Sequence, residues 1–339
     1  MGENILNNIV ALAIHDLERR NGVYQVRLAK KQLLVTPTTQ RVIDELYDLY
    51  NRRASKSHGK FTSSEGYPTQ EQIRDYVKAD TKDFLRLTSR MMETLQNQAQ
   101  ARSASTGGHV LFSHFQRDDR DYILVAIITD KLSAALRSQT DMQDVRHLDI
   151  DGFRFAGRIN LTAWAGHEER YISFLKGKGD VSEYFQHFLG CNSVIQGRVD
   201  TSNLVSALKD FVADTKMPEH EGNKFLGRAK AICERASRAR EEIEFEALAN
   251  ELIPKNPRPL SDHLAHTDRG LSDHFVPDRR ALASLVRFKG ATKQWKVEFD
   301  RDAVSTGVVR YDPKGNIITL TNVPDELVDQ LRSEGLGHG

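Results

Sequence analysis

GGHVLFSHFQ (107–116) and DYILVAIITD (121–130) are the neighbouring stretches that decide the fold. Both contain runs of β-branched and aromatic residues, at 110–115 and 122–129, bounded by glycine, aspartate or arginine, which is typical of β-strands. In the second run Ile123, Val125 and Ile127 alternate with Leu124, Ala126 and Ile128, so both faces are apolar. A strand that is apolar on both faces is predicted to lie in the middle of its sheet.

More elements of the same sheet follow on the C-terminal side. Residues 156–161 and 171–175 have the composition of strands, and the apolar residues of 181–189 recur at helical spacing. We therefore predict an α+β fold with a mixed or antiparallel core sheet flanked by helices. A helical segment and a small β-meander domain are expected to follow this sheet.

These stretches also resemble a known protein family. The residues that carry the resemblance are LFSHF (111–115), YILVAIITD (122–130), HLDID (147–151), RINLTAW (158–164) and YISFLKG…YFQHFLG (171–190). They are similar to the bacterial nucleoid-associated protein family typified by YejK, also called NdpA, and a weaker likeness runs from NIVALAIHDL (8–17) to VPDRRAL (276–282). The resemblance implies a DNA-associated, dimeric protein of the cytoplasm and nucleoid. It does not imply a known catalytic activity.

The charge balance does not by itself indicate a nucleic-acid binder. The 339 residues include 48 lysines and arginines against 47 aspartates and glutamates, a formal net charge of +1. DNA-binding domains usually carry a clear basic excess on at least one face. DNA binding by this chain would therefore depend on how its cations are distributed.

The composition indicates a globular chain of about two domains. Hydrophobic residues make up 39% and charged residues 28% of the sequence, which is ordinary for a soluble protein. No apolar run is long enough to span a membrane, and the N-terminus lacks a signal-peptide pattern, so we expect a cytoplasmic protein with no membrane partner. The two cysteines, Cys191 and Cys233, lack metal-type spacing and suggest a reducing compartment.

The N-terminal α/β domain is predicted to cover residues 1–200 and to contain the core sheet. The elements expected before that sheet are a helix at 4–14, a strand pair at 24–35 entered through the Asn21-Gly22 turn, a helix at 39–51, a helix at 69–100 interrupted near 79–80, and a flexible connector at 96–108. We place the domain boundary between Gly190 and Gly222.

The C-terminal domain is predicted to cover residues 201–339. It is expected to be helical over 201–275, starting with an N-cap at Asp200, Thr201 or Ser202. A β-meander with a closing helix is expected over 282–332, with the strands SLVRFKG, WKVEFD, GVVRYD and NIITLTN and a turn at DPKGN.

A basic stripe is predicted on a helix at about 219–240. At helical spacing Lys224, Arg228, Arg235 and Arg238 fall on one side, beside a buried face that contains Phe225, Ala229, Ile232, Ala236 and Ala239. Such a stripe is suited to lie along a phosphate backbone. It is equally consistent with a solvated charged face stabilised by pairs such as Glu234–Arg238.

Two further groups of cations are candidate phosphate contacts. Arg52, Arg53, Lys56 and Lys60 lie in NRRASKSHGKF (51–61), which contains no acidic residue and which is otherwise explained as the cationic end of a helix. Lys176 and Lys178 lie in LKGKGD (175–180), a turn between a strand and a helix that could bind a phosphate through backbone N–H groups. The alternative explanation is a turn that needs glycine for its backbone angles.

Two clusters of polar residues raise the possibility of metal chemistry. His263, His266 and His274 lie among aspartates and could hold a divalent metal, or could belong to a polar loop. Asp149 and Asp151 would share one side of a strand and could bind Mg²⁺ together with Glu168 or Asp180, as in nucleases. The spacing does not demand either site, and no GxSxG or GxGxxG motif is present, so we assign no catalytic residue, metal ion or cofactor.

The leading hypothesis is a non-enzymatic protein of the bacterial nucleoid. It would bind double-stranded DNA largely without regard to sequence and act as a homodimer. The second hypothesis is an interaction scaffold for a DNA-processing, DNA-topology or phage-defence enzyme. A metal-dependent nuclease is the third.

Overall fold

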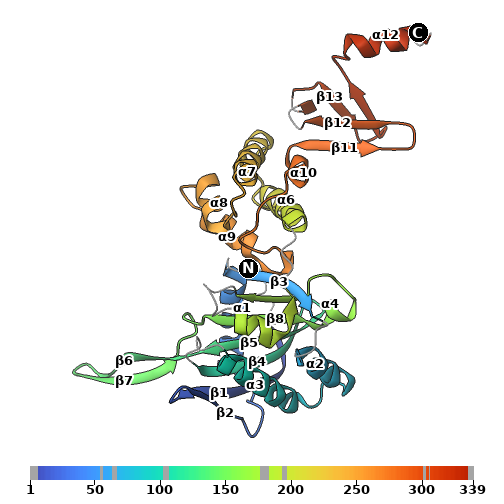
Figure 1. Ribbon diagram of the computed structural model, residues 1–339. Helices are drawn as coiled ribbons and strands as arrows, with labels where there is room; N and C mark the ends of the chain where they lie inside the picture. Colours follow the sequence, from blue (N-terminus) through green and yellow to red (C-terminus); the bar gives the residue numbers. More distant parts are fainter. Residues whose placement is uncertain are drawn as a thin grey trace.

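The computed structural model describes residues 7–53, 56–62, 67–101, 107–175, 183–192, 197–300, 303–304 and 306–334. Figure 1 shows three parts along the chain: a sheet with flanking helices, a group of helices, and a C-terminal pair of hairpins with a last helix. This arrangement confirms the predicted α+β class. Within the described part of the chain, no helix is both long and apolar enough to cross a membrane.

The first part is built on an eight-stranded sheet in the order β10-β3-β9-β8-β5-β4-β1-β2. Every neighbouring pair in this order is antiparallel. The strands are β1 (Asn8–Arg20), β2 (Val23–Arg27), β3 (Lys56–Phe61), β4 (Gly108–Arg117), β5 (Arg120–Ile128), β8 (Phe155–Asn160), β9 (Ile172–Leu175) and β10 (Cys191–Asn192). The predicted strands at 110–115, 122–129, 156–161 and 171–175 are therefore confirmed.

Strand β5 has the predicted central position, between β4 and β8. Its residues Ile123, Val125 and Ile127 belong to one apolar cluster, and Leu124 and Ala126 belong to another on the opposite face. The first cluster includes residues of α2 (Thr69–Lys78), α3 (Phe84–Ala101) and α5 (Glu183–Leu189), and the second includes residues of α1 (Pro37–Arg52). The sheet is thus covered by helices on both faces.

The N-terminal segment differs from the prediction. The helix expected at 4–14 is wrong, because the described residues from Asn8 onward form β1, which pairs with β4 and alternates between the two apolar clusters. The Asn21-Gly22 turn joins β1 to β2, with φ of 50° and 82° at the two residues. Of the strand pair expected at 24–35, only one strand, β2, is present.

Local signals set the boundaries of the first helices. Thr36 forms a capping box with Thr39 and starts α1, which covers the helix predicted at 39–51. The predicted interruption near 79–80 is confirmed, since α2 ends before Ala79 and α3 begins at Phe84. Asp80 and Thr81 have φ of 57° and 55°, which no α-helix accommodates.

A two-stranded arm leaves the sheet after β5 and was not predicted. It consists of β6 (Asp130–Ser138) and β7 (Asp141–Leu148), and it projects from the body of the protein (Figure 1). Most of its residues are exposed, among them Leu132, Leu136 and Met142. After the arm, β8 leads into the short helix α4 (Leu161–Ala165), which Asn160 caps.

The second part is a separate helical core. Its apolar cluster runs from Leu204 to Leu285. The elements are α6 (Gly197–Asp214), α7 (Glu219–Ala239), α8 (Phe245–Leu252), α9 (Arg258–Ala265), η2 (Thr267–Arg269), α10 (Arg279–Leu282) and η3 (Ala283–Leu285). The predicted helix start at 200–202 is wrong, because α6 begins at Gly197. The domain boundary at 200/201 stays a prediction.

The third part is the C-terminal module, by which we mean residues 287–333. It contains β11 (Arg287–Ala291), β12 (Lys296–Asp300), β13 (Val309–Asp312), β14 (Ile317–Leu320) and α12 (Asp325–Ser333). The expected meander is two separate antiparallel hairpins, β11–β12 and β13–β14. The closing helix expected after Pro324 is confirmed.

Truncation of the central strand tests how far the sheet core controls stability. Ile123 is fully buried in β5, so Ile123→Ala should lower the free energy of unfolding by about 2–5 kcal/mol. Leu136→Ala on the arm removes a side chain of similar size that is 75% exposed, and should change the free energy of unfolding by less than about 0.5 kcal/mol. Urea denaturation of both variants checks this, and equal losses would contradict the central position of β5.

Candidate nucleic-acid interface

The predicted phosphate-binding residues that the structure describes fall into two groups. Lys224, Arg228, Arg235 and Arg238 lie on α7, and all four are exposed. Arg52, Arg53, Lys56 and Lys60 lie at the end of α1 and in β3. Lys176 and Lys178 lie outside the described residues.

Helix α7 places its cations on the exposed side because its other side is apolar. Of the predicted face, Phe225, Ala229 and Ala236 are buried in the helical core, Ile232 is half-buried and Ala239 is exposed. The helix begins after Pro218 and ends at Arg240, whose φ of 57° breaks the helical backbone. The predicted stripe therefore exists as a set of surface positions.

The stripe is partly neutralised by acids. Arg235 donates two hydrogen bonds, of 2.8 and 3.0 Å, to the carboxylate of Glu251 on α8. Arg238 lies 3.8 Å from Glu234, the i,i+4 pair considered from the sequence. Arg228 donates to the backbone oxygen of Glu251 at 2.7 Å, close to the negative end of the α8 dipole. The guanidinium side chains of Arg235 and Arg238 nevertheless remain 67% and 66% exposed.

A second group of cations lines a cleft of about 420 Å³ between α1 and the helices α8 and α9. Arg52 and Arg53 come from the end of α1, and Arg258 comes from the start of α9. Glu246 and Asp262 also line the cleft, so its formal charge is +1. Arg258 is the cation that the sequence analysis missed, because its position 205 residues after Arg53 gives no local signal.

Helix α8 lies between the two groups of cations. Glu246 and Asn250 line the cleft, while the next residue, Glu251, meets Arg228 and Arg235 of α7. The α7 stripe and the arginine cleft therefore flank one short helix. A single polyanion lying across α8 could meet cations from both groups.

Lys56 is a correction to the predicted set. Its side chain is only 1% exposed, and its amine donates to the backbone oxygens of Tyr50 at 2.9 Å, Asn51 at 3.0 Å and Arg53. Burial lowers the pKa of this amine well below its ordinary value. Lys56 thus caps the C-terminus of α1 and is not placed to contact a phosphate.

Lys60 and Arg53 also have partners. Lys60 is half-exposed on β3 and lies 3.0 Å from Glu169. Arg53 donates to the backbone oxygen of Asp151 at 2.6 Å and stacks over the ring of Phe153 at 4.9 Å. The segment 51–61 is consequently a helix end followed by a strand, and only its exposed cations are candidates for DNA contact.

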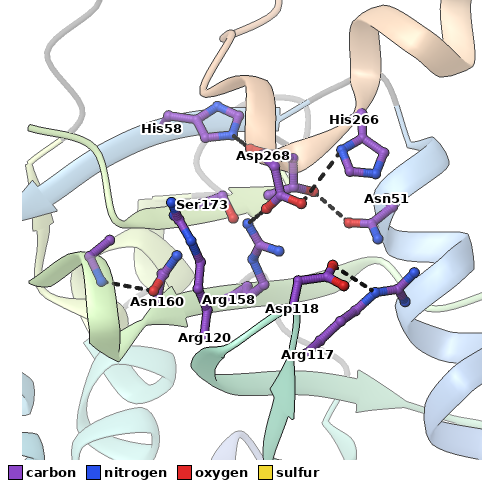
Figure 2. A network of polar contacts seen from close by, with 12 residues as sticks. Asn51, His58, Arg117, Asp118, Arg120, Arg158, Asn160, Ser173, His266 and Asp268 are labelled. Atoms are coloured by element: carbon purple, nitrogen blue, oxygen red, sulfur yellow. Dashed lines mark hydrogen bonds and ion pairs between the residues drawn. The ribbon is translucent and has the colours of Figure 1, made fainter. Parts of the chain in front are cut away.

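A buried polar junction fixes the helical core against the sheet (Figure 2). Arg158 on β8 donates to Asp268 and to the hydroxyl of Tyr47, both at 2.8 Å, and lies over the ring of Tyr122. Although burial opposes it, the Arg158 guanidinium lowers the pKa of Asp268. A second ion pair joins Arg170 to the fully buried Asp200 at 2.6 and 3.0 Å.

His58 completes the junction from β3. Its Nε2 lies 3.2 Å from the backbone oxygen of Thr267, whose hydroxyl donates to Asn51 at 2.8 Å (Figure 2). Burial, together with the nearby charges of Lys56, Arg170 and Arg158, lowers the pKa of His58 to about 3. The imidazole is therefore neutral in the folded protein near neutral pH.

The structure gives no support to the two metal hypotheses. Within the described residues, no group of three or more His, Cys, Asp or Glu side chains is placed to hold a metal ion. Strand β7 ends at Leu148, so the expectation that Asp149 and Asp151 share one side of a strand is wrong. His263 instead lies 2.9 Å from the backbone oxygen of Ala207, and His274 lies near Glu242 and Glu244.

Comparisons with known proteins point to one family. The family model described as "Nucleoid-associated protein YejK" matches residues 13–328. A nucleoid-associated protein of Pseudomonas syringae pv. tomato is 31% identical over 327 residues, which cover 94% of this chain and 97% of that protein. A nucleoid-associated protein of Metapseudomonas resinovorans is 28% identical over 328 residues, which cover 95% of this chain and 98% of that protein.

Replacement of the buried lysine tests its capping role. Lys56→Met removes three hydrogen bonds to the end of α1 and should lower the free energy of unfolding by about 1–3 kcal/mol. Lys60→Met removes an exposed ion pair and should cost less than about 1 kcal/mol. Chemical denaturation measures both, and an equally small effect of Lys56→Met would contradict the capping role.

The buried imidazole predicts a pH dependence of stability. His58 takes up a proton below about pH 6.5 in the unfolded chain but only below about pH 3 in the folded protein. The stability that the neutral imidazole contributes to the folded protein is therefore complete above about pH 6.5 and is lost as pH falls. Between about pH 7.5 and 5, the wild type should lose about 2 kcal/mol more stability than His58→Gln. Urea denaturation at both pH values checks this, since the other histidines are common to both proteins. Equal losses would mean that His58 titrates in the folded state.

Proposed function

The chain belongs to the YejK family of nucleoid-associated proteins, and from this premise we propose that it is a non-enzymatic DNA-binding protein of the bacterial nucleoid. It binds double-stranded DNA largely without regard to sequence and acts as a homodimer. The observation that best supports DNA binding is the pair of cation groups on the two sides of α8. These are the α7 stripe, with Lys224, Arg228, Arg235 and Arg238, and the cleft with Arg52, Arg53 and Arg258.

The ion pairs on this surface are compatible with phosphate binding. Exposed pairs such as Arg235–Glu251 are screened by water and contribute little to stability, so a guanidinium exchanges a carboxylate for a phosphate at small cost. Contacts with phosphates carry no direct sequence information, which accounts for binding that is largely independent of sequence. Two copies of a modest basic surface in a homodimer raise the affinity through multivalency.

Neutralising the two groups of cations tests the proposed DNA contact. The variants Arg228→Gln/Arg235→Gln and Arg52→Gln/Arg258→Gln should each weaken binding to unrelated duplexes by a similar factor. Because phosphate contacts release counterions, wild-type affinity should fall steeply between about 50 and 200 mM salt, and the logarithmic salt slope should decrease by about one for each contact removed. Fluorescence anisotropy with two duplexes of different sequence measures both quantities.

A matched control is available at the far end of the sheet. Arg20 and Arg27 on the β1–β2 hairpin are 67% and 72% exposed and also pair with acids, so Arg20→Gln/Arg27→Gln removes the same charge elsewhere. This control should bind DNA as the wild type does. A wild-type affinity that does not respond to salt, or an equal loss in the control, would contradict the proposed interface.

The β6–β7 arm supports the second candidate function, an interaction scaffold for a DNA-processing enzyme. Residues 130–148 contain three lysines or arginines and three aspartates, so the arm has no basic excess that would attract DNA. Its exposed Leu132, Leu136 and Met142 are better suited to contact a protein. A co-purifying enzyme that survives nuclease treatment, and is lost with Leu136→Ser/Met142→Ser, would favour the scaffold.

A further inference from the structure

The C-terminal module contains an open apolar groove. The groove has a volume of about 350 Å³ and lies between the β11–β12 and β13–β14 hairpins. Its walls include Trp295 and Val297 of the first hairpin region and Tyr311 and Ile318 of the second. Trp295 is 51% exposed, Tyr311 57% and Ile318 42%, so large apolar side chains border the groove in contact with water.

The same module also has a helix with an uncovered apolar side. Leu327 and Leu331 of α12 are spaced four residues apart, lie on one face of the helix, and are 45% and 42% exposed. Among the residues that the structure describes, α12 buries none of its own side chains. A helix of nine residues is too short to be stable in water without tertiary contacts. An apolar surface that covers Leu327 and Leu331 would supply these tertiary contacts.

The groove and the helix are also complementary in charge. Residues 325–333 contain Asp325, Glu326 and Asp329 against one arginine, a formal charge of −2. Residues 287–300, which form the β11–β12 hairpin, contain four lysines or arginines against two acids, a formal charge of +2. The formal charges of the hairpin and the helix are thus opposite in sign, which favours their association.

We propose that α12 of one copy lies in the groove of a second copy, and that the second copy returns the same contact. In Figure 1, α12 extends beyond the hairpins at the end of the chain. Because one chain carries both complementary surfaces, a two-fold arrangement covers both helices and both grooves at once, as in an isologous dimer. This inference specifies the contact behind the homodimer in the proposed function.

The oligomeric state of variants in each surface tests this contact. Sedimentation equilibrium should find a wild-type dimer, with the dissociation constant raised at least tenfold by Leu327→Ser/Leu331→Ser and by Trp295→Ser. Leu34→Ser, between β2 and α1, changes a side chain that is 76% exposed and should leave the dimer intact. A retained cooperative thermal transition shows that the variants are folded, because loss of the dimer by itself lowers the thermal midpoint and the helicity of α12.

A cross-linking experiment separates exchange between copies from closure within one copy. Leu331→Cys protein is mixed with Ile318→Cys protein under mild oxidation, and the native Cys191 and Cys233 do not compete because both are buried. A covalent product with one chain of each kind is expected. If the Leu331→Cys/Ile318→Cys double variant forms the bond within one chain instead, α12 occupies its own groove and the inference fails.

The outcomes also separate this inference from the proposed function. A dimer that persists in both surface variants, or that dissociates equally in the Leu34→Ser variant, overturns the α12 contact and leaves the homodimer in place. A monomeric wild-type protein overturns the homodimer and the contact together. DNA binding is read independently, from the arginine variants of α7 and of the cleft.

Discussion

The contact on which the other features depend is the ion pair between Arg158, whose side chain is 5% exposed, and Asp268, whose side chain is 43% exposed. The Arg158 guanidinium lies against Tyr47 and Tyr122 and is shielded from water, and the hydroxyl of Tyr47 and the carboxylate of Asp268 from the helical core compensate for the lost hydration. Loss of Asp268 would leave the buried guanidinium of Arg158 without its ionic partner, which favours the orientation of the two parts in which Asp268 reaches it. The arginine cleft exists only in this orientation, because Arg52 belongs to the sheet side and Arg258 to the helical core.

The sequence predicted those elements whose burial follows a local pattern. Strand β5 is apolar on both faces, and α7 repeats its apolar residues at helical spacing. Strand β3 could not be found in this way, because KSHGKF is polar while Lys56, Ser57 and His58 are buried. Their burial depends on hydrogen bonds to the end of α1 and to residues beyond 260, and no periodicity encodes such contacts.

The candidate interface was likewise predictable from the sequence only in part. Helical spacing was sufficient to place Lys224 and the three arginines on one exposed side of α7. It could not predict that Glu251, on the next helix, binds Arg235 with both carboxylate oxygens. The approach of Arg258 to Arg52 is likewise a product of tertiary folding. The sequence thus shows where lysines and arginines are dense, whereas the fold determines which of their side chains reach solvent.

The ends of the eight-stranded sheet limit how copies of this protein associate. One edge is β10, a strand of two residues, and the other is β2, a strand of five residues whose Arg27 is held by Asp16 and Glu18. Short and charged edges give an incoming strand few main-chain groups to pair with, so continuous cross-β growth is disfavoured. Association of copies through side-chain surfaces is therefore favoured over strand addition at these two edges.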